Sequence, residues 1–268
     1  MKKLDLICGL CVLESESLAI EVAGKVIESI EPVKDKVNFI FKGSFDKANR
    51  SSFDSYRGPG MEKGLDILSK VKKQFNVPVL TDIHLPHQCD PVASVVDVLQ
   101  IPAFLCRQTD LIVSAAEACE KNNRLLNVKK GQFLSPEESK NIIKKVEGFL
   151  NINSLLLTER GTSFGYNNLV VDMSSFSIMK AFGVKVIHDA THCVQRPGGL
   201  GKSTGGKREQ IEVLAQAAIA AGADGVFMET HPVPDRALSD SATCIELSKV
   251  RTIVSNLVKI KEVVNEFN

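Results

Sequence analysis

Short apolar runs of β character alternate with longer amphipathic stretches along the whole chain, and this alternation limits its possible folds more than any other feature. Strands that alternate with helices join into parallel sheets through right-handed crossovers. Eight runs are typical of buried strands: 6–13, 38–42, 79–84, 98–102, 125–129, 155–160, 185–189 and 226–229. Eight such units in 268 residues predict one closed (β/α)8 TIM barrel, a single α/β domain over residues 1–268.

Helices are expected between these strands, and their patterns agree with the barrel. The clearest helix start is Ser135-Pro-Glu-Glu138, where a cap residue precedes proline and two acids. No Gly-x-Gly-x-x-Gly follows the first strand, which disfavours a dinucleotide-binding fold. The predicted helices are 17–30, 61–75, 87–95, 109–121, 136–150, 172–182, 207–221 and 248–267.

The composition disfavours several classes of protein. A net charge of +1 gives no bulk attraction to nucleic acid or to an anionic membrane, so neither partner is expected. No apolar segment is typical of a signal peptide or a membrane span. Seven scattered cysteines, an odd number, predict a reducing cytoplasm. Cys8 and Cys11 have the spacing of a redox pair, but they lie in a predicted strand, where positions three apart face opposite sides. The sequence therefore disfavours a redox pair.

Polar or thiol groups follow all eight predicted strands, at the ends that form the active-site mouth of a (β/α)8 barrel. A single polar residue there would be interpreted as a barrel-wall residue paired with a neighbour. Eight strand ends out of eight favour a catalytic mouth. The groups are Cys11, Lys42, Asp82 and His84, Gln100, Asn127 with Lys129 and Lys130, and the strand ends 158–160, 188–192 and 229–231.

Cations form one subset of this mouth. The loop 42–52 mixes basic side chains with the hydroxyl and amide groups of Ser44 and Asn49. Such mixtures suit phosphate and carboxylate groups, because charge-assisted hydrogen bonds to oxyanions are strong. The cations expected on one rim are Lys42, Lys47, Arg50, Lys129 and Arg160. They predict a substrate with more than one anionic group.

A second subset offers metal ligands. Cys11, His192, Glu229 and Asp240 supply a thiolate, an imidazole and two carboxylates, which suit Zn²⁺, Fe²⁺ or Mn²⁺. Only the barrel would bring them together. The glycine-rich stretch 196–208 follows the seventh strand. Three interpretations of it stay open: a lid over the mouth, a phosphate-binding loop and an unstructured loop.

Seven stretches in order along nearly the whole chain resemble the 3-deoxy-D-manno-octulosonate 8-phosphate synthase family, and Lys47-Ala-Asn-Arg-Ser51 is a specific signature of it. The stretches are 42–52, 100–110, 127–133, 158–161, 164–168, 189–192 and 227–232. The resemblance implies a TIM barrel, usually a homotetramer. It also implies a transferase that condenses phosphoenolpyruvate with arabinose 5-phosphate and releases phosphate, in the lipopolysaccharide sugar pathway of Gram-negative bacteria.

The resemblance also implies residue roles. Phosphoenolpyruvate would be held by Lys42, Lys47, Lys129 and Arg160. The pentose phosphate would be held by Asn49, Arg50 and Ser51, with Arg50 and Ser51 reaching the sugar phosphate in a neighbouring subunit's site. Asp82 and Gln100 would complete the substrate contacts. The catalytic set so implied is Lys42, Lys47, Asn49, Lys129, His192 and Asp240.

The family has metal-dependent and metal-free branches, told apart mainly by Cys or Asn at the end of the first strand. Cys11 implies the metal-dependent branch, with His192, Glu229 and Asp240 as its other ligands. Leu10 replaces the usual proline of that branch, and Cys193 replaces a small residue such as serine. These two departures leave the identity of the metal open.

Three alternatives remain. The related 3-deoxy-heptulosonate phosphate synthases use erythrose 4-phosphate but carry Lys-Pro-Arg-Thr or Lys-Pro-Arg-Ser where this chain has Lys47-Ala-Asn-Arg50. A Schiff-base aldolase would use Lys42 or Lys129 as its nucleophile. The third alternative is a phosphosugar-binding protein without catalytic activity.

Overall fold

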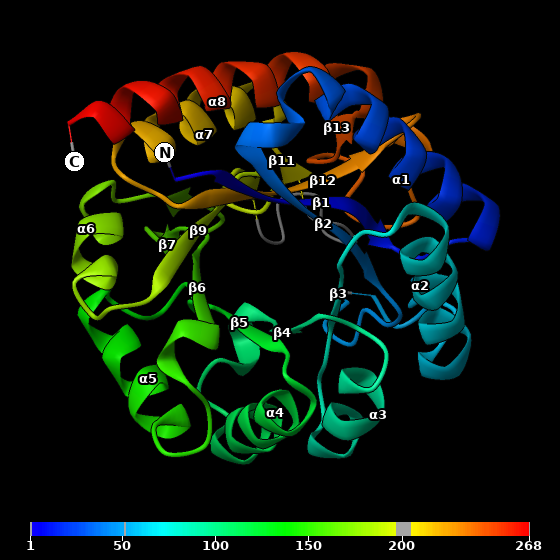
Figure 1. Ribbon diagram of the computed structural model, residues 1–268, viewed down its shortest axis with the longest axis horizontal. Coiled ribbons are helices and arrows are strands. Elements are labelled where there is room, and N and C mark those ends of the chain that lie inside the picture. Colours follow the sequence, from blue (N-terminus) through cyan, green and yellow to red (C-terminus); the bar gives the residue numbers. More distant parts are fainter. Residues whose placement is uncertain (1, 51, 197–204, 268) are drawn as a thin grey trace.

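The computed structural model describes residues 2–50, 52–196 and 205–267, and its centre is a closed barrel of parallel strands (Figure 1). Each strand pairs with the next in sequence order, and the last strand pairs back with the first. This confirms the predicted (β/α)8 fold. The strands are β1 (Leu4–Val12), β2 (Val37–Ser44), β3 (Val79–Asp82), β4 (Val98–Ile101), β5 (Leu125–Lys129), β6 (Leu155–Glu159), β9 (Lys185–Asp189) and β12 (Gly225–His231).

Helices form a ring around the barrel, as Figure 1 shows. Four of them begin later than predicted, because the first turns of the segments 87–95, 136–150, 207–221 and 248–267 lie in 3-10 conformation. Ser135 and Glu138 cap the second segment, each side chain accepting a hydrogen bond from the other's backbone N–H. The helices are α1 (Glu16–Ile30), α2 (Met61–Phe75), α3 (Cys89–Ala93), α4 (Thr109–Asn122), α5 (Lys140–Val146), α6 (Ser174–Lys180), α7 (Ile211–Ala220) and α8 (Val250–Glu266).

Small hairpins at the mouth were not predicted from the sequence. One pairs β7 (Thr162–Ser163) with β8 (Leu169–Val170), and the other pairs β10 (Gln195–Arg196) with β11 (Gly205–Gly206). A further short strand, β13 (Ile245–Glu246), pairs with the end of β12. Two-residue strands have no hydrophobic period to recognise. Most of the predicted loop 196–208 lies outside the described residues, since 197–204 are not described.

The barrel interior has an apolar floor beneath a polar ring. The floor is built from Ile7, Leu80, Val98, Leu156, Ile187 and Phe227. Side chains two positions apart on a strand face the same side. Two residues beyond each floor residue, the same strands therefore place Gly9, Asp82, Gln100, Thr158, Asp189 and Glu229 in the next layer. This alternation puts the polar groups at the C-terminal ends of the strands.

At Gly9 the first two strands approach so closely that a side chain is excluded. A Cβ atom at this position would lie 2.1 Å from the carbonyl oxygen of Lys42. The register between β1 and β2 is irregular between Gly9 and Val12, within which Cys11 lies. Irregularities of this kind re-aim side chains. Here the Sγ of Cys11 lies 3.4 Å from Oδ2 of Asp240, inside the mouth.

The seven cysteines, all within the described residues, are buried free thiols, as expected for a chain without a disulfide framework. Cys8 packs in the core between strands and helices, and Cys11 lies at the mouth, so the two thiols do not form a redox pair. None of the described helices is long and apolar enough to cross a membrane.

Candidate active site

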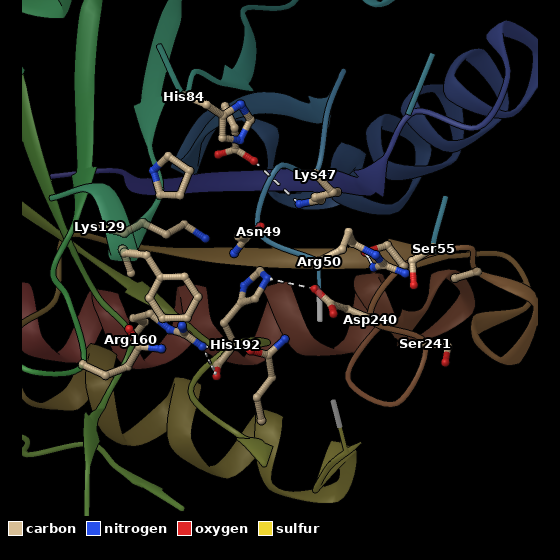
Figure 2. Close-up of a pocket in the computed structure, with 18 of the residues that line it drawn as sticks. Lys47, Asn49, Arg50, Ser55, His84, Lys129, Arg160, His192, Asp240 and Ser241 are labelled. Atoms are coloured by element: carbon tan, nitrogen blue, oxygen red, sulfur yellow. Dashed lines mark hydrogen bonds and ion pairs between the residues drawn. The ribbon is translucent and has the colours of Figure 1, made fainter. Parts of the chain in front are cut away.

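A cavity of about 250 Å³ opens at the C-terminal ends of the strands (Figure 2). Figure 2 shows Lys47, Lys129 and His192 pointing toward one another from different elements of the barrel. Most of the residues predicted from sequence line this cavity: Lys47, Asn49, Arg50, Asp82, Lys129, Arg160, His192 and Asp240.

Lys129 and Arg160 form one wall of the cavity, and both are buried. The Nζ of Lys129 donates to Asp189 at 2.6 Å and lies 3.6 Å from the ring centroid of Phe227. Arg160 donates through Nη2 to the carbonyl oxygen of His192 and to Oε1 of Gln195, both at 2.9 Å. These contacts fix both cations at the end of the barrel wall.

Lys47 lies across the mouth between two carboxylates. Its Nζ is 3.6 Å from Asp82 and 3.8 Å from Glu229. Asp82 also accepts hydrogen bonds from Ser44 and from Gln100, at 2.5 and 2.6 Å. Burial alone would raise the pKa of Asp82, but the charge of Lys47 and other nearby lysines holds it well below its usual range. Asp82 is therefore a fixed anion that positions Lys47.

Arg50 reaches the mouth from the loop after β2. Its guanidinium donates to Oγ of Ser239 at 2.6 Å and to the carbonyl oxygen of Leu238 at 3.1 Å. Arg50 thus lines the cavity of its own chain, next to Asn49. A contact from Arg50 to a neighbouring subunit stays a prediction, and Ser51 lies outside the described residues.

Lys42 lies beneath the cavity and is completely buried. Its Nζ donates to Glu229 and to the carbonyl oxygen of Cys11, both at 2.6 Å. Gln100 lies at the same depth, where it accepts a hydrogen bond from Asn127 at 2.8 Å. A direct contact of Lys42 or Gln100 with a substrate stays a prediction.

The four predicted metal ligands lie together at the mouth. One ligand atom each from Cys11, Glu229 and Asp240 lies within 4.8 Å of the other two. The Nε2 of His192 is 3.5 Å from both carboxylates. Its Nδ1 contacts Asp189 at 2.8 Å, an arrangement that orients a histidine toward a metal ion.

The electrostatics of this cluster suit a cation. Burial raises the pKa of the Cys11 thiol, and the charge of Glu229 raises it further. Burial would also raise the pKa of Glu229, but His192, Lys42 and Lys47 lower it to about 2. Oε2 of Glu229 is buried without a hydrogen-bond partner. A thiol, a carboxylate with a free oxygen and an oriented imidazole fit a borderline divalent metal ion.

Comparisons with known proteins show the family of the chain. The family described as DAHP synthetase I family matches residues 2–266. The chain belongs to the DAHP synthetase I family. This member of the family is also similar to proteins named 2-dehydro-3-deoxyphosphooctonate aldolase, another name for the synthase whose motifs the sequence resembles.

Identity to these proteins is about one half over nearly the whole length of this DAHP synthetase I family member. The relative from Geobacter sp. (strain M21) is 51% identical over 265 residues, covering 99% of this chain and 94% of the relative. The relative from Paraburkholderia phymatum is 50% identical over 279 residues, covering 100% and 96%. The relative from Fusobacterium nucleatum is 50% identical over 263 residues, covering 98% and 92%. The family predicted from sequence is thus confirmed.

Several buried polar atoms at the mouth of this DAHP synthetase I family member have no hydrogen-bond partner. They include Nε of Arg160, Oε1 of Gln132 and Nδ1 of His84, and all three residues line the cavity. Buried polar groups in folded proteins are nearly always paired. A bound polar ligand or water molecule would supply the missing partners of such groups.

Some members of the site were given no role from sequence. Asp189 contacts both Lys129 and His192, and it lies three residues before His192 in a stretch that carried the family resemblance. Gln195 and Ser239, the partners of Arg160 and Arg50, have no such signal. Their roles arise from loops that only the folded barrel brings together.

Proposed function

We propose that this chain condenses phosphoenolpyruvate with D-arabinose 5-phosphate and water, giving 3-deoxy-D-manno-octulosonate 8-phosphate and phosphate, for lipopolysaccharide synthesis. The observation that carries the proposal is the convergence of Lys47, Lys129, Arg160 and Arg50 on one cavity beside His192. Relatives about half identical over nearly the full length carry the name 2-dehydro-3-deoxyphosphooctonate aldolase, which supports the same reaction.

In this proposal the cations bind and orient two polyanions. Lys129 and Arg160 hold phosphoenolpyruvate against the end of the barrel wall, and Lys47 neutralises it from the other side. Arg50 exchanges its contacts with Ser239 and Leu238 for the phosphate of the sugar, and Asn49 binds beside it. Holding both substrates in near-attack geometry lowers the entropic part of the barrier.

The chemistry needs no lysine adduct. The enol double bond of phosphoenolpyruvate is nucleophilic at C3, which attacks the aldehyde carbon of the open-chain sugar. The aldehyde oxygen takes up a proton, and water adds to C2 as positive charge develops there. The tetrahedral carbon then expels phosphate and becomes the ketone of the product. Fixed charges already present at the mouth stabilise the charge that develops.

Cys11, His192, Glu229 and Asp240 would hold the divalent metal ion in this proposal. When bound, such an ion orients and acidifies a water molecule or polarises a carbonyl oxygen. Asp189 keeps a proton on Nδ1 of His192, so Nε2 carries the free lone pair. Lys42 neutralises Glu229 from beneath, which limits the repulsion among the acidic ligands.

The proposal is tested by measuring phosphate release from phosphoenolpyruvate with and without arabinose 5-phosphate. We expect release that requires the sugar and matches the amount of eight-carbon product formed. Absence of turnover, with both compounds bound, would support the phosphosugar-binding alternative and contradict the proposed reaction.

The same assay predicts sugar specificity. Arabinose 5-phosphate should exceed erythrose 4-phosphate in kcat/KM by about tenfold or more, because polar groups that lose their partners with the wrong substrate lower its efficiency. Asn49 and Arg50 occupy the positions where the 3-deoxy-heptulosonate phosphate synthases, which use a four-carbon sugar phosphate, carry Pro-Arg. Both residues line the cavity. Equal efficiency with the two sugars would favour the 3-deoxy-heptulosonate phosphate synthase alternative.

One observation bears on the Schiff-base alternative. Burial lowers the pKa of Lys129, a property of lysines that form imines, although its pairing with Asp189 opposes this. Lys42 is held by two short hydrogen bonds beneath the cavity. Borohydride treatment of the protein with either substrate should leave no reduced adduct on Lys129, and a trapped adduct there would establish an imine mechanism.

We further propose that residues 1–268 act as one catalytic domain in the cytoplasm and assemble as a homotetramer. Large side chains exposed on loops at the mouth end support the assembly: Phe53 and Tyr166 are each 99% exposed, and Phe164 is 73% exposed. Large apolar side chains that are exposed in a single chain can be covered by a contact with another chain. Sedimentation of the purified protein tests the assembly.

A further inference from the structure

Lys129 and Arg160 each have a charged sequence neighbour that the proposed reaction does not use. These neighbours, Lys130 and Glu159, do not line the cavity but are buried with side-chain exposures of 0% and 1%. Because successive side chains at a strand end alternate, they lie behind β5 and β6 while Lys129 and Arg160 line the cavity. Nζ of Lys130 is 3.4 Å from Oε2 of Glu159.

This buried pair ties together the loops that follow β5 and β6. Lys130 donates to the carbonyl oxygen of Leu134 at 3.0 Å, in the first loop, and to Oγ1 of Thr162 at 3.1 Å, in the second. Glu159 accepts a hydrogen bond from the N–H of Gly161 at 2.5 Å. Gly161 has a φ of +88°, a backbone conformation that favours glycine, so the turn that Glu159 accepts from requires glycine at this position.

A backbone contact completes the connection. The N–H of Ser163, in β7, donates to the carbonyl oxygen of Gln132 at 2.9 Å. The two tied loops therefore carry Gln132 and Arg160, which line the cavity, and Lys129, the last residue of β5, lines it beside them. Any change in the separation of the loops changes the separation of these three side chains.

Stability alone gives a poor reason for burying this pair. Two buried charges lose much of their hydration, so an apolar pair of similar volume is often as stable. Burial raises the pKa of Glu159, and Lys130 and the N–H of Gly161 oppose that rise. Oε2 of Glu159 has no hydrogen-bond partner, so its contact with Lys130 is an ion pair. The directional link between the two loops is made by the hydrogen bonds of Lys130 to Leu134 and Thr162, which Glu159 holds in place by its charge and which an apolar pair would not supply.

We propose that Lys130 and Glu159 are positioning residues that set the spacing of Lys129, Gln132 and Arg160 for phosphoenolpyruvate. This inference rests on the proposed function. Residues that orient the ligands of a metal ion typically change metal affinity or activity by about 10- to 100-fold when altered, and we expect an effect of the same order for residues that orient Lys129 and Arg160. The sugar-binding residues Asn49 and Arg50 belong to the loop after β2 and take no part in the link.

The test uses Glu159→Gln and Lys130→Met, singly and together, in the full-length protein. Calorimetric titration gives Kd for phosphoenolpyruvate, steady-state phosphate release gives KM for each substrate, and thermal melting gives Tm. A matched control is Lys180→Met, since Lys180 also bonds a carbonyl oxygen and a carboxylate, those of Gly222 and Asp224, before the start of β12.

We expect Glu159→Gln to raise Kd and KM for phosphoenolpyruvate by about tenfold or more, with KM for arabinose 5-phosphate within about twofold of the wild type. The double variant should lose no more than the worse single one, because both residues act through one link. Lys180→Met should lower Tm without changing Kd. If Lys130→Met does not fold, the Kd of Glu159→Gln for phosphoenolpyruvate alone decides whether the inference holds.

The inference is overturned if Kd for phosphoenolpyruvate in Glu159→Gln stays within about twofold of the wild type. Equal weakening of both substrates would also overturn it, since that result indicates a general structural role. Failure of the proposed function looks different: the wild-type protein itself would then neither bind phosphoenolpyruvate nor release phosphate from it.

Discussion

Exhaustive chelation of the wild-type protein should abolish phosphate release, and a divalent cation should restore it. The expected loss is about 100-fold or more, since a metal ion contributes several kcal/mol of charge stabilisation. The geometry behind this expectation is the cluster of Cys11, Glu229 and Asp240, with His192 at 3.5 Å from both carboxylates. Elemental analysis before and after chelation provides a measurement independent of activity.

Variants at Cys11 sharpen this prediction. Cys11→Ala should bind metal poorly and be nearly inactive, because it removes the soft ligand. Cys11→Asn should keep measurable activity that chelator does not affect, since an amide can hydrogen-bond a water molecule or a substrate oxygen, as expected for the metal-free branch. The control is Cys119→Ala, which removes a buried thiol from α4, away from the mouth.

The competing interpretation is that Cys11 is only a small buried thiol at the end of β1. It predicts that both Cys11 variants lose some stability, like Cys119→Ala, and that chelator does not change phosphate release by the wild-type protein. Unchanged wild-type activity after chelation, together with protein that contains no metal, would reject the metal site.

Arg160→Ala should lower kcat/KM for phosphoenolpyruvate by about 30- to 150-fold, which corresponds to about 2–3 kcal/mol. The change removes a guanidinium that lines the cavity and whose buried Nε has no hydrogen-bond partner among the described residues. Hydrogen bonds from a charged donor to a phosphate or carboxylate are among the strongest in proteins. Phosphate release at varied phosphoenolpyruvate gives the comparison.

The matched control is Arg124→Ala. Arg124 also donates to a carbonyl oxygen, that of Ala93, but it precedes β5 at the opposite end of the barrel. It should lower Tm without changing kcat/KM. An insoluble Arg160→Ala protein with normal residual activity would instead make Arg160 a structural residue.

Much of the fold and the mouth could be predicted because, in a (β/α)8 barrel, a residue at the C-terminal end of any strand lies at the mouth. The bounds of β5 and β9 agree with the predicted 125–129 and 185–189, where apolar runs are short and clearly limited. The convergence of Lys129, Arg160 and His192 follows from their positions after parallel strands. The order of the strands along the chain is enough to predict that side chains at these strand ends lie close together.

The sequence could not predict how deep each side chain lies or which partner it takes. No sequence pattern indicated that the ammonium group of Lys42 is hydrogen-bonded to Glu229 beneath the cavity, and its contact with substrate stays a prediction. Asp189 was given no role from sequence because its two contacts, with Lys129 and His192, depend on the packing of neighbouring strands. The two-residue hairpins at the mouth are stabilised by tertiary contacts and have no local signal.

The pairing of β1 with β12 closes the barrel, and the candidate site lies across this seam. Cys11 and Asp240 are 229 positions apart in sequence, and Lys42 and Glu229 are 187 apart. Contacts of such separation form slowly, because the chain must lose loop-closure entropy before they stabilise it. A growing chain that ends before β12 has an ammonium group at Lys42 without its carboxylate. Activity regained on refolding therefore reports closure of the complete barrel, and it should appear later than the circular dichroism of the helices.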